Sequence, residues 1–280
     1  DGVNTSAPET VEINGSQLVL DITVNPGQSK VFNTADAVFT FTATGFEGGD
    51  TEAILTGSLE RAPGENVGNY SIGLGTLDAG NKYSINFTPA DFEITPAPIT
   101  GVVFNGGSFV YDGTSKSLPF ASGTFPPNAS DTYVNNARTI VGTQEVTATI
   151  SAPNYTTLEL KANLTITPAP LQVTALTQSK VYGSMLTLDT DQVSYSGFVN
   201  GEDETVLGGG FILTSVGGVD ASATADVATY VDEIAPSGLT ADNYDITFIN
   251  GDLQVTKAPL TVTALRQSKA VGTVLTLDID

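Results

Sequence analysis

The stretch TPAPLQVTALTQSK, residues 167–180, is written again as TKAPLTVTALRQSK at residues 256–269. Eleven of the fourteen positions are identical, and the two copies lie 89 residues apart. A third Pro-bearing phrase, TPAPIT, occupies residues 95–100, and the tripeptide QSK also occurs at residues 28–30. Self-similarity of this kind is typical of a chain built from repeated small units rather than from one large body.

Other motifs recur in the same order around these phrases. An Asn close to a Tyr precedes each Pro phrase, in AGNKY (79–83), APNY (152–155) and ADNY (241–244). Further upstream come VGNY (67–70), VGTQ (141–144) and VATY (227–230), and GFEGGDTEAIL (45–55) matches GFVNGEDETVL (197–207). The ordered set predicts three repeats and the start of a fourth, at residues 1–97, 98–169, 170–258 and 259–280.

Each repeat has the pattern of β-strands. LELKANLTIT (158–167) alternates for ten residues, which places Leu158, Leu160, Ala162, Leu164 and Ile166 on one face. The only helical signal is a single turn after Gly49 or Gly201, where Asp50 or Asp203 would cap the N-terminus. The Asn before each Tyr is a natural turn former. We therefore expect an all-β fold of tandem small antiparallel β-sandwich-like modules.

The joints between repeats are short and contain proline. Because Pro fixes φ and lacks an N–H, such joints are extended and stiff rather than flexible. The sequence therefore predicts modules joined into an elongated rod.

Composition excludes several classes of function. The chain has 31 acidic and 10 basic residues, a net charge of −21, and neither Cys nor His. Such an acidic surface disfavours binding to nucleic acid and to anionic membranes. No apolar run is long enough to insert in a membrane. The first ten residues lack a signal-peptide pattern, so we expect an interior piece of a longer protein, with removal of a signal as the alternative. Catalytic motifs are also absent, and we predict that the chain is not an enzyme.

The ordered motifs resemble those of a known family. QSKVYG, GFVNGEDETVL and VGNYSI are similar to the MBG (mostly-β, glycine-rich) repeats of large bacterial surface proteins, and FVYDGTSKSL (109–118) resembles the related YDG type. The resemblance implies tandem extracellular repeats in adhesins and supplies no catalytic residues. The first repeat has Val-Phe-Asn where the pattern has Val-Tyr-Gly, so the role of that tripeptide stays open.

Three groups of residues are candidates for a site. Asp189, Asp191, Asp278 and Asp280 recur at one repeat position and suit calcium, or simply end strands and solvate a turn; no other cofactor is expected. The QSK lysines suit edge strands, where a charge blocks strand pairing, or alternatively an intramolecular isopeptide bond. Tyr83, Tyr155 and Tyr244 are expected in cores or corners, with sugar stacking as the alternative.

These observations predict a structural stalk segment of a cell-surface adhesin, located outside a bacterial cell. Its partners would be neighbouring repeats, with surface glycans or host or substratum proteins bound by distal domains. One alternative is a polymerising sheath or filament subunit that uses the partial C-terminal repeat for strand complementation. Another is a glycan- or protein-binding module, for which residues 205–226 are the best candidate loop.

Overall fold

The strand β1 (Leu18–Val24) illustrates how the sequence builds its sheets. Leu20, Ile22 and Val24 are buried and the residues between them are exposed, because successive side chains of a strand point to opposite faces. In this computed structural model, which describes residues 15–120 and 123–276, β1 pairs antiparallel with β3 (Phe41–Thr44) and parallel with β6 (Tyr83–Thr88).

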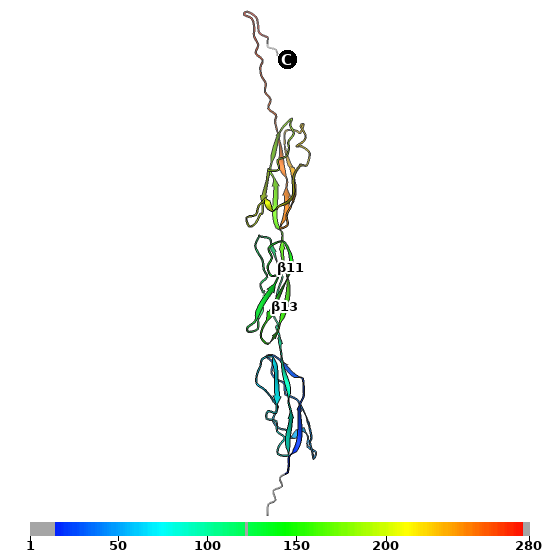
Figure 1. The fold of residues 1–280 in the computed structure, drawn as a ribbon. Coiled ribbons are helices and arrows are strands. Elements are labelled where there is room, and N and C mark those ends of the chain that lie inside the picture. The colour runs from blue at the N-terminus through cyan, green and yellow to red at the C-terminus, as the bar shows by residue number, and fades with distance from the viewer. Residues whose placement is uncertain (1–14, 121–122, 277–280) are drawn as a thin grey trace, which may run out of the picture. The chain divides into compact units, whose positions relative to one another are not determined.

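The backbone contacts divide the chain into two units. The first contains the described residues of 1–105, 119–135 and 145–162, and the second those of 106–118, 136–144 and 163–280. The strands β11 (Gly142–Ser151) and β13 (Leu158–Thr167), labelled in Figure 1, contribute residues to both units.

In the first unit, two sheets form what we call the first sandwich. One sheet has the order β3-β1-β6, and the other has the order β2-β7-β5-β4 with bounds Gln28–Val31, Ala90–Thr95, Gly68–Gly73 and Glu60–Arg61. Two short strands pair next to it, β8 (Ala97–Pro98) with β12 (Tyr155–Thr156). The strand β10 (Ser130–Val134) pairs antiparallel with β11.

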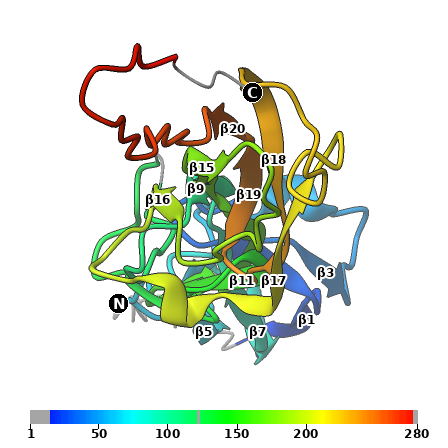
Figure 2. The same cartoon turned by 90° about the horizontal axis from the view of Figure 1, so that it is seen from above.

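In the second unit, two further sheets form the last sandwich. Their orders are β16-β14-β19, with bounds Val193–Ser196, Ala169–Ala175 and Tyr244–Ile249, and β15-β20-β18-β17, with bounds Gln178–Val181, Gly251–Thr256, Thr229–Thr240 and Gly208–Ser215. Figure 2 shows β18 between its neighbours β17 and β20. The strand β13 pairs parallel with β9 (Gly107–Val110).

The all-β prediction is confirmed, and the fold consists of tandem β-sandwich-like units. The expectation of antiparallel sheets was wrong in part. Four strand pairs run parallel: β1 with β6, β2 with β7, β14 with β19 and β15 with β20. Parallel strands need a long connection, and each pair joins the beginning of a sandwich to its end. Alternation along one strand carries no information about the direction of its partner.

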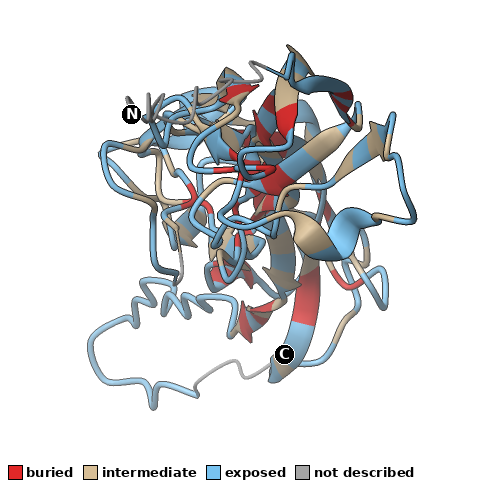
Figure 3. Ribbon diagram, turned by 90° about the horizontal axis from the view of Figure 1, so that it is seen from below, coloured by how far each residue is buried: buried red, intermediate tan, exposed pale blue. Residues whose placement is uncertain are grey.

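Each sandwich has its own apolar core, and Figure 3 shows the buried residues as red segments of the ribbon. In the first, Leu20, Ile22, Ile72, Phe92 and Ile94 are at most 1% exposed. Alternation was also the correct guide to β13, in which Leu164 and Ile166 are buried and Leu158, Leu160 and Ala162 are half-buried. The structure contains, among the residues it describes, no helix with the length and apolar character that a membrane span requires.

Candidate functional site at the joints between repeats

The first joint, Thr95–Pro98, is held by the side chain and backbone of Asn154. Its Oδ1 accepts a hydrogen bond from the backbone N–H of Val67 at 2.9 Å, and its Nδ2 donates to Oδ1 of Asn66 at 3.0 Å. Its carbonyl accepts from the N–H of Ala97 at 3.0 Å. With φ of 69°, Asn154 has the left-handed conformation that asparagine tolerates. One residue thus binds the sandwich before the joint and the joint itself.

An aromatic contact lies beside this hydrogen-bonded asparagine. The rings of Phe32 and Tyr155 meet edge to face with centroids 5.5 Å apart. Tyr155 also pairs with Ala97 in the short parallel β8–β12 ladder. Edge-to-face ring pairs stabilise by about 0.5–1.5 kcal/mol beyond the area that they bury. The joint therefore combines apolar packing with directional hydrogen bonds.

The second joint, Thr167–Pro170, repeats this arrangement with Asn243. Its Oδ1 accepts from the N–H of Val141 at 3.1 Å, and its carbonyl accepts from the N–H of Ala169 at 3.0 Å. The next residue, Tyr244, pairs with Ala169 at the start of the parallel β14–β19 ladder. We call this set of contacts, made by an Asn and the Tyr after it, the Asn–Tyr clamp.

The rings at the second joint are more deeply buried than those at the first. Tyr111 and Tyr244 are each 5% exposed, and their ring centroids are 5.6 Å apart. Both hydroxyls donate to the carboxylate of Glu202, that of Tyr111 at 2.6 Å to Oε1 and that of Tyr244 to Oε2. Ile166, Ala169 and Leu171 complete a shared apolar core. Residues on both sides of this joint thus fold into one cluster.

The structure shows the role of the tripeptide Val-Phe-Asn and its counterparts, which the sequence left open. The backbone N–H groups of Phe32, Tyr111 and Tyr182 donate to the carbonyls of Thr95, Thr167 and Thr256, the threonines at which the joints begin. In the first two cases the ring packs on the Tyr of the next clamp. The aromatic residue is thus the part of the tripeptide that makes the joint contacts. The third position is Asn33, Asp112 or Gly183, and Asn33 and Gly183 have the positive φ that Asn and Gly tolerate.

The clamp position of the first sandwich is occupied by Lys82. The N–H of Leu18 donates to the carbonyl of Lys82 at 3.0 Å, as Ala97 and Ala169 do to the two clamp asparagines. The sequence suggested Asn81 for this position, but the structure shifts the register by one residue. Tyr83 then corresponds to Tyr155 and Tyr244.

One of the two predicted cap residues has a different task. Asp203 caps the turn η2 (Glu204–Val206) as predicted, by accepting from the N–H of Thr205 at 3.0 Å. In η1 (Glu52–Ile54) the cap is Thr51, not Asp50. Asp50 instead accepts from Lys82 at 2.6 Å and from the Tyr83 hydroxyl at 2.9 Å, as Glu202 does from Tyr244. These partners, Lys82 first, hold the pKa of Asp50 below its ordinary value.

Two of the three tyrosines that were expected in cores or corners are buried there. Tyr83 and Tyr244 are 3% and 5% exposed, whereas Tyr155 is half-buried at the first joint. The hydroxyl of Tyr83 accepts from the N–H of Glu47 at 2.8 Å, and that of Tyr244 from the N–H of Val199 at 3.1 Å. Each ring thereby fixes the bend that follows β3 or β16.

The QSK tripeptides at residues 28–30 and 178–180 lie on edge strands, but their lysines point inward. Lys30 and Lys180 are 8% and 6% exposed, so the prediction that they protect an edge from pairing is wrong. The side chain of each glutamine forms two hydrogen bonds with one backbone position 11 or 12 residues further along the chain. Gln28 accepts from the N–H of Thr40 and donates to its carbonyl, and Gln178 does the same with Asp189.

The buried ammonium groups of the two lysines have different kinds of partner. The Lys30 ammonium lies 2.7 Å from Asp36 and 2.5 Å from Glu65, and Arg61 pairs with the same two carboxylates. The pKa of Asp36 is lowered, chiefly by Arg61, and that of Lys30 is raised, chiefly by Asp36. These shifts favour ion pairs rather than the neutral amine and acid that an isopeptide bond requires. The Lys180 ammonium instead donates to the backbone carbonyls of Val219 and Ser222.

The loop that the sequence suggested for ligand binding is held by a buried carboxylate of the same sandwich. The carboxylate of Glu233, 7% exposed, accepts from the Ser215 hydroxyl and from the N–H groups of Gly217 and Val219. Burial by itself would raise the pKa of Glu233, but these donors outweigh it and lower the pKa. With Lys180 bound to the same loop, this part of residues 205–226 serves the last sandwich itself.

The calcium candidates remain a prediction. The Asp189 Oδ1 accepts from the N–H of Asp191 at 3.0 Å in a local turn, and Asp191 lines an open hollow together with Glu204. Asp278 and Asp280 lie outside the described residues. Across 15–120 and 123–276, no three or more Asp or Glu side chains gather into a group that fits a metal ion.

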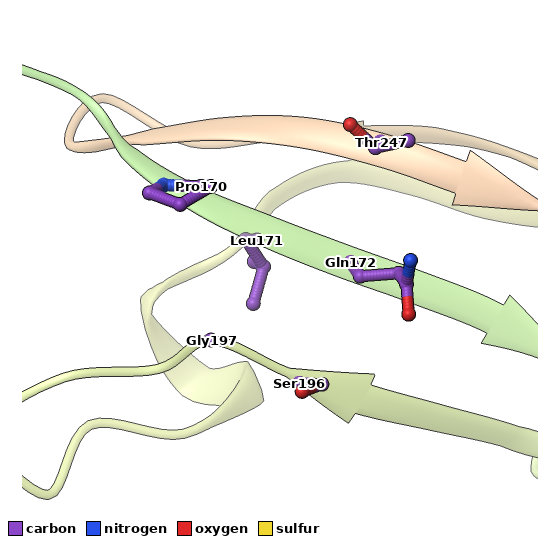
Figure 4. A pocket seen from close by; sticks show the side chains of 6 residues that line it. All are labelled: Pro170, Leu171, Gln172, Ser196, Gly197 and Thr247. Atoms are coloured by element: carbon purple, nitrogen blue, oxygen red, sulfur yellow. The ribbon is translucent and has the colours of Figure 1, made fainter.

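A hollow of about 370 Å³ lies over β14 and β19 of the last sandwich. Figure 4 shows its lining: Gln172, Ser196 and Thr247 carry the polar side chains, and Pro170, Leu171 and Gly197 complete it. None of these side chains titrates, so this hollow lacks the paired carboxylates on which glycoside hydrolysis depends.

The Glu202 contacts predict an alkaline transition at the second joint. The hydrogen bond to Glu202 raises the pKa of Tyr111 to about 12 from an ordinary value of 10.0. A raised pKa means that the folded state keeps its proton longer, so the stabilisation is complete below pH 10 and is lost as the pH rises through about 12. In an alkaline titration, tyrosinate absorbance should reveal tyrosines of the native chain that ionise above the ordinary pKa of 10.0. The Tyr111→Phe variant should have one fewer of them. Loss of no such tyrosine in that variant would contradict the contact.

Both sandwiches match a known protein family. A family model described as the MBG domain of the YGX type matches residues 20–93 and 171–254, more than half of the chain. None of the curated proteins compared with the chain matches it.

Similar solved structures include an insect immune protein, tandem Ig domains and domains of a phage capsid protein. The insect immune protein hemolin is 11% identical over 68% of this chain, which spans only 56% of the hemolin chain, with a TM-score of 0.24. The four N-terminal Ig domains of Dscam1 isoform 4.4 are 9% identical, covering 85% of this chain and 73% of theirs, at 0.21. Three N-terminal domains of the highly immunogenic outer capsid protein of bacteriophage RB49 are 12% identical, covering 87% and 99%, at 0.21. Scores this low carry no argument about function.

Proposed function

Since the chain belongs to the MBG domain family, we propose that it is a non-catalytic stalk segment of a bacterial cell-surface adhesin. In this role it consists of repeats at residues 1–97, 98–169 and 170–258, with a fourth beginning at 259. It holds a distal binding domain away from the cell, and the distal domain meets surface glycans or proteins. The segment's own partners are its neighbouring repeats.

The observation that carries this proposal is the repetition of one joint chemistry. The Asn154 clamp binds Val67 and Ala97, and the Asn243 clamp binds Val141 and Ala169 through the same backbone groups. A spacer needs a fixed angle at each joint, because a flexible joint would let the repeats fold back on one another. Directional hydrogen bonds and packed rings at both joints meet that need.

The charge of the chain supports the same role. Residues 1–97 and residues 170–258 each carry a net charge of −10, whereas residues 98–169 carry only −1, so the first and last repeats repel one another. At physiological ionic strength this repulsion is screened beyond about 8 Å, so it acts only when the chain folds back and brings those two surfaces close together. It favours extended over collapsed arrangements of the repeats.

Small-angle X-ray scattering tests the proposal on the native chain. A compact body of this length would have a radius of gyration of about 19 Å. Three repeats of about 33 Å placed end to end would span about 100 Å, which gives a radius of gyration of about 29 Å. We expect a value near the larger figure, unchanged by calcium or chelator if the joints are held by protein contacts alone. A value near the smaller figure would contradict the spacer function.

A further inference from the structure

The last sandwich carries an aromatic side chain in the joint position but nothing packed upon it. Tyr182 donates its N–H to the carbonyl of Thr256 at 2.8 Å, as Phe32 and Tyr111 do to Thr95 and Thr167. Its side chain is 46% exposed, whereas Tyr111 is 5% exposed. No ring of the described residues pairs with it.

The polar groups that receive a clamp are also present and unused. Val227 follows Asp226 as Val67 follows Asn66, and the equivalence is fixed by a tyrosine: the Tyr230 hydroxyl donates to the Asp226 carbonyl at 3.1 Å, and that of Tyr70 to the Asn66 carbonyl at 2.7 Å. In the part of the chain that the structure describes, the N–H of Val227 has no acceptor.

The joint that follows this sandwich also has a backbone N–H group that no described residue binds. Ala258 stands where Ala97 and Ala169 stand in the phrases TPAP and TKAP. Those two alanines donate their N–H groups to clamp asparagines, whereas the N–H of Ala258 has no acceptor among the described residues and Ala258 is exposed. Tyr182, Asp226, Val227 and Ala258 therefore form a face that matches the receiving side of the first joint. It matches the second joint in all positions but that of Asp226, where Ile140 stands.

We propose that this face is the docking surface for a fourth repeat, linked through Ala258, that carries its own Asn–Tyr pair. The asparagine Oδ1 accepts from Val227 N–H, its Nδ2 donates to the Asp226 carboxylate, and its carbonyl accepts from Ala258 N–H. The tyrosine ring packs edge-on against Tyr182. This inference rests on the proposed function, because it supplies the partner that a tandem spacer requires.

The N-terminal sandwich of a second copy does not fit this face. At the clamp position it presents Lys82, whose ammonium already binds Asp50 and the carbonyl of Glu47. An ammonium has three donors and no acceptor, so it leaves the Val227 N–H without a partner. The chain is therefore expected to remain a monomer instead of joining head to tail into a filament.

Amide hydrogen exchange on an extended chain tests the proposal. Residues 258–280 are replaced by a copy of residues 97–169, which brings the Asn154–Tyr155 pair into the fourth position. A second extended chain carries a copy of residues 169–256 with Asn243–Tyr244 instead, in case the first copy does not fold. In either folded chain we expect the Val227 amide to exchange about tenfold or more slowly than in the native chain, at a rate close to that of Val67.

The matched control changes only the clamp asparagine of the added copy. Asn→Lys at that position imitates Lys82 and should return Val227 to its rate in the native chain, while the added copy keeps its own protected amides. A folded fourth repeat beside an unprotected Val227 would overturn the docking surface, even where scattering supports the spacer. Protection of Val227 in a concentration-dependent dimer of the native chain would overturn the exclusion of a second copy.

Discussion

Tyr244→Ala is expected to lower the free energy of unfolding of the last sandwich by about 3–5 kcal/mol, the range for deleting a buried aromatic ring. The ring is 5% exposed and packs edge-on against both Tyr111 and Phe198, with centroids 5.6 Å away in each case. Its removal opens a cavity in the cluster shared across the second joint. It also leaves Glu202 with only the Tyr111 hydroxyl. Urea unfolding followed by circular dichroism measures the change.

Two variants separate the ring from its hydroxyl and from its place in the chain. Tyr244→Phe keeps the ring and loses two hydrogen bonds, one to Glu202 and one from the N–H of Val199. Its effect should be about 2 kcal/mol, mostly from the bond to the charged carboxylate. Tyr155→Ala removes the equivalent ring at the first joint, where it is only half-buried, and should cost less than Tyr244→Ala. Equal losses for Tyr244→Ala and Tyr244→Phe would show that the shared core contributes nothing.

Lys180→Met is expected to lower the free energy of unfolding of the last sandwich by about 2–4 kcal/mol, because a buried and a partly buried carbonyl lose a charged donor. Met has nearly the length and volume of the lysine stem, so the change removes the ammonium without opening a large cavity. The carbonyls of Val219 and Ser222 then keep only long backbone hydrogen bonds, from the N–H groups of Ser222 at 3.3 Å and Ala225 at 3.4 Å. The loop around them should lose amide protection before the rest of the sandwich unfolds.

Lys30→Met is the matched control, since it changes the same QSK position in the first sandwich. Its partners Asp36 and Glu65 have side chains that are 30% and 66% exposed, and Arg61 pairs with both. Water and Arg61 can therefore satisfy the carboxylates after the lysine is gone. The loss of stability should be clearly smaller than for Lys180→Met. A larger loss at Lys30 would contradict the assignment of Lys180 as the donor that holds its loop.

Local sequence patterns predicted the strands and the repeats but not how distant segments meet. Alternation along residues 158–167 correctly placed Leu164 and Ile166 in the interior. The turn around Glu204 and its cap Asp203 were also predicted, because a cap acts on neighbouring residues. The parallel pairing of β1 with β6 was not, since its partners are 65 residues apart and either direction fits the same alternation.

The sequence motifs identified the asparagines of the clamps but not the distant residues that they bind. The Asn of APNY was recognised as a turn former, which its positive φ confirms, yet its partner Val67 is 87 residues away. The recurrence of Val-Gly or Val-Ala in VGNY, VGTQ and VATY was the signal for that partner. Lysines are rarely buried without partners, so the inward position of Lys180 depended on carbonyls about 40 residues downstream that no local pattern reveals.

A distance measurement across a single joint tests the clamp most directly. The chain has no cysteine, so two introduced cysteines carry the only spin labels. Exposed positions suit the labels: Glu93→Cys with Glu159→Cys for the first joint, and Asn163→Cys with Asp245→Cys for the second. Each pair is measured by double electron–electron resonance, with and without Asn154→Ala or Asn243→Ala.

We expect one narrow distance distribution for each labelled pair, broadened severalfold when the clamp asparagine of that joint becomes alanine. The alanine at the other joint serves as the control and should leave the distribution narrow. A distribution that is already broad with both asparagines present, and that is not changed by either alanine, would contradict the claim that the Asn–Tyr clamps fix the joints.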